Sequence, residues 1–231
     1  MIQIGNAPCS WGVEFADDPR NPSWRQVLSD CATAGYKGIE LGPIGFMPED
    51  PATLADALAE HDLTLIGGVV FRPFHDPAKW DEVQDAARRT CASLTAHGAK
   101  HLVLIDSIAP ARAPTAGRAD EAVQMDPAEW ASFTNRFRDI AKLGTDHGLT
   151  VSIHAHAAGF MDFEPELERL LGEIDPSILK ALQAAADTLS NQALRADALE
   201  ALVRVREGAP LGSALAQHGR FPGLLGMFAK L

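Results

Sequence analysis

The first 177 residues alternate short apolar runs with amphipathic segments of helical period, and this alternation restricts the fold more than any other feature. The apolar runs typical of β-strands span residues 2–5, 37–42, 63–70, 101–106 and 149–156. Helices are expected over about 23–34, 51–60, 79–97, 127–147 and 164–173. Such repetition predicts an α/β fold of parallel βα units around one sheet.

Short junctions between the expected elements support this pattern. The joins "AGYKGIEL", "EHDLTLI", "HGAKHLVL" and "HGLTVSI" each end a helix at Gly or a short polar pair, and a strand follows at once. In "NPSW" and "DPAEW", Pro follows an Asn or Asp that is expected to cap the next helix. The βα order is therefore supported by local signals as well as by hydrophobic period.

Polar and aromatic residues stand at the carboxyl end of each expected strand, where parallel α/β folds gather their functional groups. For Glu40 the alternative is an ordinary strand-end acid, and for Asp106 it is a cap of the following loop. The candidates for a substrate pocket are Asn6, Trp11, Glu40, Arg72, His75, Asp106 and His154.

His154 and His156 lie two residues apart in the run 149–156. Because side chains alternate along a strand, Ser152, His154 and His156 are expected to share one face. Two imidazoles followed by an acid are typical of a metal site. The alternative is a pair of core or surface histidines.

The segment 107–124 is rich in Ala, Pro and Gly and is expected to form a lid over the strand ends or a solvated loop. Arg112 and Arg118 in it are candidates for an anionic substrate, but we expect both to face solvent.

Composition excludes several classes of protein. The formal net charge is −11 and Lys and Arg do not cluster, so we expect no nucleic-acid partner. No apolar run approaches the ~20 residues of a membrane helix, and "MIQIGNAPCSWG" does not resemble a signal peptide. The three cysteines are scattered, which favours reduced thiols and a cytoplasmic location.

Residues 1–177 resemble the xylose-isomerase-like barrel family of sugar isomerases, epimerases and inosose dehydratases. The likeness rests on "GNAPCSWG", "GYKGIELGPIGFMPED", "LTLIGGVVFRPFHDP" and "IHAHAAGFMDFEPELERLL". The resemblance implies a (β/α)₈ barrel, a small polyol or keto-sugar substrate, and a divalent metal such as Mn²⁺ or Co²⁺. It also implies that His154, His156 and Asp162 are metal ligands. The metal would polarise a carbonyl or hydroxyl while an acid or base moves a proton.

The chain departs from the family pattern at two places. Asp162 stands where the family usually has glutamate, and no strand-like run or ligand motif follows Ser177. We therefore expect an incomplete barrel of about five βα units, with open sheet edges that favour self-association. Because the strands that should carry the remaining metal ligands are missing, we also expect weak metal binding and little turnover.

Residues 178–231 have only helical patterns, and they carry 6 Lys and Arg against 4 Asp and Glu, whereas residues 1–177 carry 14 against 27. Four helices are expected there, with leucine stripes. The segment resembles the cytoplasmic domain of type II secretion system protein F, through "ALQAAADTLSN", "VREGAPLGSAL" and "RFPGLLGMF". That resemblance implies a scaffold that contacts a secretion ATPase. We thus expect two domains, 1–177 and 178–231, joined as a fusion or chimera.

Overall fold

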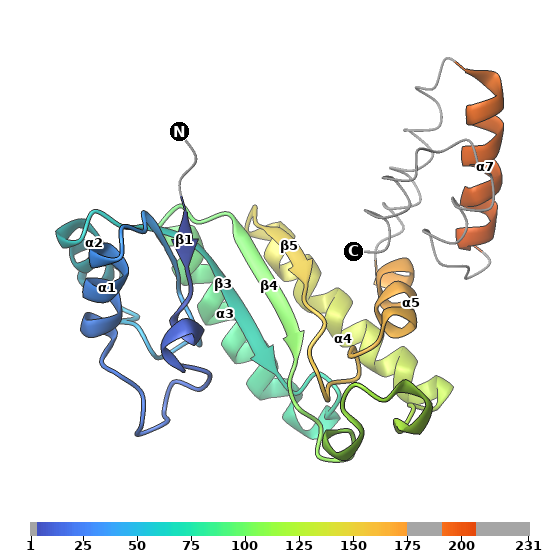
Figure 1. Cartoon of the computed structure of the whole chain (residues 1–231), viewed down its shortest axis with the longest axis horizontal. Coiled ribbons are helices and arrows are strands. Elements are labelled where there is room, and N and C mark those ends of the chain that lie inside the picture. Colours follow the sequence, from blue (N-terminus) through green and yellow to red (C-terminus); the bar gives the residue numbers. More distant parts are fainter. Residues whose placement is uncertain (1–3, 175–190, 207–231) are drawn as a thin grey trace. The chain divides into compact units, whose positions relative to one another are not determined.

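The computed structural model describes residues 4–174 and 191–206. Its strands are β1 (Gly5–Asn6), β2 (Gly38–Glu40), β3 (Thr64–Arg72), β4 (His101–Asp106) and β5 (Thr150–Ile153). They form one parallel sheet in the order β1-β2-β3-β4-β5 (Figure 1). The expected α/β fold with five parallel strands is confirmed.

The helices follow the strands in the expected order. They are α1 (Trp24–Thr33), α2 (Pro51–Glu60), α3 (Trp80–Ala96), α4 (Pro127–Asp146), α5 (Glu164–Ile174) and α7 (Gln192–Arg206). Single 3₁₀ turns occur at η1 (Pro8–Trp11), η2 (Pro77–Lys79), η3 (Ala113–Thr115) and η4 (Ala119–Glu121). Within the described residues, no helix is long and apolar enough to cross a membrane.

Side-chain caps explain where the helices begin. Asp126 accepts hydrogen bonds from the backbone N–H groups of Ala128 and Glu129, at 2.7 and 2.9 Å, and Glu129 bonds back to the N–H of Asp126. The cap by Asp expected at "DPAEW" is confirmed, and the bond from Glu129 makes it reciprocal. At "NPSW" the expected capping residue, Asn21, is wrong by two residues. The side chain of Ser23 instead accepts a hydrogen bond from the backbone N–H of Gln26 at the start of α1.

The two faces of β3 and β4 differ in what covers them. Gly68 approaches Leu94 and Thr90 of α3 so closely that an added Cβ would lie 3.2 Å from Leu94. On this face Leu102 and Leu104 are fully buried. Figure 1 shows α3 behind the strands, and the opposite face toward the viewer. That opposite face carries the half-buried residues Val69, Phe71, Val103 and Ile105.

Contacts divide the chain into unit 1 (residues 1–124 and 139–159) and unit 2 (residues 125–138 and 160–231). Unit 1 holds the whole sheet. In unit 2, Trp130 packs against Phe133 with ring centroids 5.5 Å apart, and its indole N–H donates to Glu173 at 3.0 Å. Trp130 thus ties α4 to α5.

The expected domain boundary at 177–178 lies outside the described residues. Of the four helices expected after it, α7 is the one that falls within them, and it confirms a helix there. No sixth strand occurs in the described ranges 4–174 and 191–206.

Candidate functional site

The two histidines lie just past the end of β5, not within a strand that reaches residue 156. β5 ends at Ile153, although His154 still donates its backbone N–H to Leu104 at 3.0 Å. The chain then turns sharply, with Ala158 at φ +65°, a conformation rare for a residue with a Cβ. The expected strand end is therefore corrected by about three residues.

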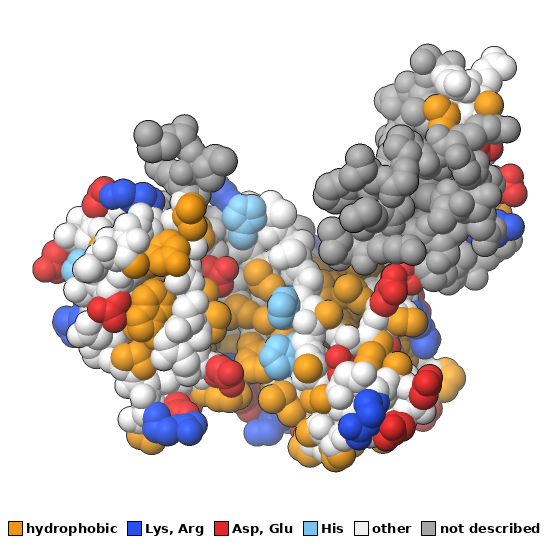
Figure 2. All heavy atoms as spheres, in the orientation of Figure 1, with side chains coloured by type: hydrophobic (Ala, Val, Ile, Leu, Met, Phe, Trp, Pro, Cys, Tyr) orange, Lys and Arg blue, Asp and Glu red, His pale blue; other side chains and the backbone are white. Residues whose placement is uncertain are grey.

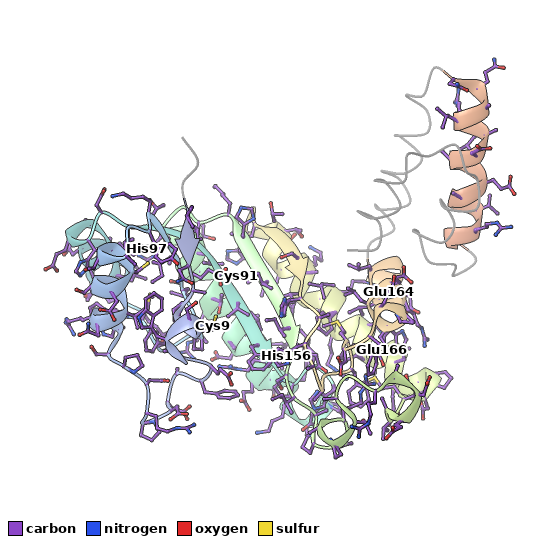
Figure 3. The ribbon with its side chains drawn as sticks, in the orientation of Figure 1. Cys9, Cys91, His97, His156, Glu164 and Glu166 are labelled. Carbon is purple, nitrogen blue, oxygen red and sulfur yellow. The ribbon has the colours of Figure 1, made fainter. Side chains whose placement is uncertain are left out.

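Four rings form a continuous row at the carboxyl end of the sheet. Phe15 stacks on Phe71 with centroids 5.8 Å apart, and Phe71 lies 4.9 Å from His156. His156 in turn lies 6.3 Å from His154. We name Phe15, Phe71, His156 and His154 the aromatic row. Figure 2 shows histidine side chains among apolar ones on this surface, and Figure 3 places His156 at the ends of β4 and β5.

The structure brings His75 and Asp106 together. Asp106 ends β4, is 1% exposed, and lies 2.9 Å from Nδ1 of His75 in the loop between β3 and α3. Arg72 pairs with Asp106 in the strand register, but its guanidinium donates to the carbonyl of Phe71. The Nε of Arg72 is buried without a hydrogen-bond partner in the described structure. Asp106 thus holds the loop between β3 and α3 through a candidate pocket residue, whereas its alternative interpretation was a cap of the loop that follows β4.

Glu40 lies deeper along the open face of the sheet. Its partner in the register is Gly67, four positions before Phe71 on β3, or ~13 Å at ~3.3 Å per residue. The carboxyl is half-buried, and this burial raises its pKa above the ordinary value of 4.5. A carboxyl of this kind holds a proton more readily at neutral pH than a solvated one does.

Asn6 and Trp11 order the loop that follows β1. The side-chain oxygen of Asn6 accepts hydrogen bonds from the N–H of Ala7 at 2.8 Å and from the hydroxyl of Ser10 at 2.7 Å. The indole of Trp11 donates to Asp30 of α1 at 3.1 Å. Trp11 also lines a groove with Phe15 and Asn21, which places this loop beside the aromatic row.

The segment 107–124 is ordered around Arg112, and the expectation that Arg112 faces solvent is wrong. Its side chain is 1% exposed, and its guanidinium donates to the carbonyl of Val123 at 3.0 Å. One buried arginine thereby closes the segment on itself. Arg118 is exposed as expected and pairs with Glu121 at 3.1 Å.

The expected metal ligands fit an ion only in part. Nδ1 of His156 lies 2.9 Å from the carbonyl of Ala157, which directs a hydrogen to Nδ1 and leaves Nε2 as the basic nitrogen, as in many metal-binding histidines. Among the described residues, however, no three His, Cys, Asp or Glu side chains gather closely enough to hold one ion. Asp162 belongs to unit 2 and the histidines to unit 1, so the set His154, His156 and Asp162 stays a prediction.

Sequence comparison relates most of the chain to known proteins. Residues 28–206 match the family described as xylose isomerase-like TIM barrel. The inosose dehydratase of Salmonella typhimurium is 27% identical over 187 residues, covering 78% of this chain and 60% of the relative. That of Geobacillus kaustophilus is 25% identical over 195 residues, covering 78% and 59%. The chain thus spans about 60% of the length of these relatives.

Solved structures agree on the fold. A xylose isomerase-like TIM barrel protein from Mycobacterium smegmatis, in complex with magnesium, superposes with a TM-score of 0.58 at 14% identity, covering 75% of this chain and 61% of that one. The probable 3-DHS dehydratase AsbF from Bacillus anthracis gives a TM-score of 0.54 at 18% identity, covering 76% and 60%. These similarities show a shared architecture.

Proposed function

This chain belongs to the xylose isomerase-like TIM barrel family, and we propose that it binds a small polyhydroxylated carbonyl compound and moves a proton next to the carbonyl. The sugar isomerase, epimerase and dehydratase classes of this family share that step. Relatives named inosose dehydratase make an inosose, a cyclic polyol with one ketone, the first compound to test.

The observation that carries this proposal is the environment of Glu40. Its carboxyl lies half-buried on the open face of the sheet, and burial raises its pKa. General acid–base catalysis works best when the catalytic pKa approaches the working pH. We assign Glu40 the role of the base that removes a hydrogen from the carbon beside the carbonyl. In dehydration, the electron pair of that C–H bond forms a C=C bond as a neighbouring hydroxyl leaves, and the departing hydroxyl takes up the proton held by Glu40 and is released as water.

A divalent metal such as Mn²⁺ or Co²⁺ is the proposed cofactor, with His154, His156 and Asp162 as its ligands. It would polarise the substrate carbonyl when bound. The imidazole of His156 supports this assignment, because the carbonyl of Ala157 fixes its tautomer. Since the described residues do not assemble three ligands, the role of Glu40 is proposed without a step through the metal.

Hydrogen exchange tests the proposed function at its first step. The full chain is incubated in D₂O with inosose and Mn²⁺, and NMR follows the replacement of the carbon-bound hydrogen by deuterium. We expect exchange above the protein-free rate, and a loss of about 100-fold or more in Glu40→Gln. Glu60→Gln, at the exposed end of α2, is the matched control and should exchange like the unchanged chain. Equal rates with and without protein would refute the proposal.

The alternative is a non-catalytic module in which residues 178–231 bind a secretion or pilus-assembly ATPase. Of that segment, the structure describes residues 191–206, which hold α7. A pull-down with the full chain, and with residues 178–231 deleted, tests this proposal. Capture of the ATPase that depends on the deleted residues would support it, and no capture by the full chain would end it.

A further inference from the structure

We propose that the aromatic row is a stacking shelf that selects substrates in closed-ring form. The proposal rests on the proposed function, because it names the shape of the substrate for the same face of the sheet. It adds Phe15 and Phe71, two residues that sequence patterns did not single out.

Phe15 is unusual among the phenylalanines that the structure describes. Its side chain is 44% exposed, whereas Phe74, Phe133 and Phe137 are fully buried. Leaving an aromatic ring in water forgoes the free energy of its burial. A single exposed ring is ordinary on a protein surface, but this one stacks on a second ring that continues into two histidines.

The loop that carries Phe15 fixes the backbone at this residue. The side-chain amide of Asn21 donates to the carbonyl of Phe15 at 2.6 Å. Asp18, one turn further, binds Arg20 through its carboxylate at 2.6 Å, and this arginine holds the pKa of Asp18 down at about 2. A ring that stands on a fixed backbone and already stacks on Phe71 loses less conformational freedom when a ligand covers it. Phe15 is therefore preorganised for stacking.

The chemistry of the row suits one kind of ligand. Aromatic faces carry partial negative charge, and the C–H groups on one face of a cyclic polyol present a flat, weakly positive, apolar surface. The hydroxyls around the edge of such a ring require hydrogen-bond partners, and in the chain without bound metal Nε2 of His156 can accept from one of them. An open-chain polyol has no flat face and must lose more rotational freedom to lie on the row. The row should thus prefer closed rings.

A matched pair of ligands tests this preference without turnover. Myo-inositol and sorbitol have equal numbers of carbons and hydroxyls, but only the first is a ring. NMR titrations of the full chain should show tighter binding of myo-inositol, with shifts of the imidazole signals of His154 and His156. Phe15→Ala should weaken the binding of myo-inositol roughly three- to tenfold and leave the binding of sorbitol unchanged. Ile4→Ala, which removes a 64% exposed side chain just before β1, is the control.

Phe71→Leu provides a second variant that keeps an apolar side chain in the sheet. It should also weaken the binding of myo-inositol. Equal affinity for the two polyols, or unchanged affinity in both variants, would overturn the shelf. The exchange assay with inosose then judges the proposed function separately: exchange that depends on Glu40 but not on Phe15 leaves that function standing. If neither polyol binds, the shelf is rejected even where exchange is observed.

Discussion

The buried carboxylate of Asp106 accepts two hydrogen bonds from one residue, His75. The backbone N–H of His75 donates at 3.0 Å, and Nδ1 of its imidazole lies 2.9 Å from the same oxygen. The two residues are 31 positions apart. This contact fixes the loop after β3 against the end of β4, beside the surface on which we place the substrate.

Asp106→Ala should lower the free energy of unfolding by about 2–3 kcal/mol, because it removes a charged acceptor from buried donors. Urea denaturation measures the change. The control is Asp120→Ala in the exposed turn η4, for which we expect a change within about 0.5 kcal/mol. Similar losses in both variants would show that the contact with His75 contributes little.

At position 159, glycine is the only residue type that fits against Asp106. A Cβ there would lie 2.9 Å from the backbone carbonyl oxygen of Asp106, closer than such atoms pack. Gly159→Ala should therefore destabilise the chain by about 1–3 kcal/mol through forced backbone movement. Gly172→Ala is the matched control, since its Cβ would meet nothing within 4 Å in α5 and should stabilise the helix by up to about 1 kcal/mol. The same sign for both changes would contradict this account.

Elements with a clear period were predictable from the sequence. β4 occurs at the expected residues 101–106, and α2 at 51–60, because burial alternates with the strand and helix periods. Strand ends were harder: β5 stops at Ile153, before the sharp turn at Ala158. Period alone does not report such a turn.

The site was predictable only as a set of strand ends. The pattern singled out His75, Asp106 and His156, but the pair of Asp106 with His75 depends on a loop conformation. The stacking of Phe15 on Phe71 joins residues 56 positions apart, and no local signal marks it. Arg112 was misplaced for the same reason, because a lone arginine in an Ala- and Pro-rich segment gives no sign of burial.

Glu40 should make stability depend on pH in a defined direction. Its folded pKa is raised by burial, so the folded chain holds a proton that the unfolded chain has already lost. Stability therefore falls as pH rises from the ordinary value near 4.5 through the raised pKa. Glu40→Gln should remove this fall and be more stable than the unchanged chain at neutral pH, with the difference vanishing in acid. Thermal unfolding across pH 3–8, a range of about five units around the ordinary carboxyl pKa, tests it. A difference that grows in acid would contradict the assignment.

The three cysteines should react unequally with a thiol reagent. Cys9 is exposed, whereas Cys31 and Cys91 are buried. Burial raises the pKa of Cys31 and raises that of Cys91 to about 11, so both stay protonated and unreactive at neutral pH. Mass spectrometry after brief labelling of the native chain should find one modified thiol, lost in Cys9→Ser. Urea should expose all three, and rapid native labelling of Cys91 would refute the packing of α3.

Metal retention tests how far the histidine pair can act alone. Two imidazoles and one carboxylate are a sufficient set for a divalent ion only if all three meet, and the described residues do not gather such a set. We therefore expect less than one equivalent of Mn²⁺ or Co²⁺ per chain after gel filtration, measured by elemental analysis. His154→Ala together with His156→Ala should abolish what remains, because it removes two of the three proposed ligands and leaves one carboxylate. His101→Ala, at the amino end of β4, is the control and should retain as much metal as the unchanged chain. One tightly held ion per chain, lost in Asp162→Ala, would instead show that Asp162 completes the site.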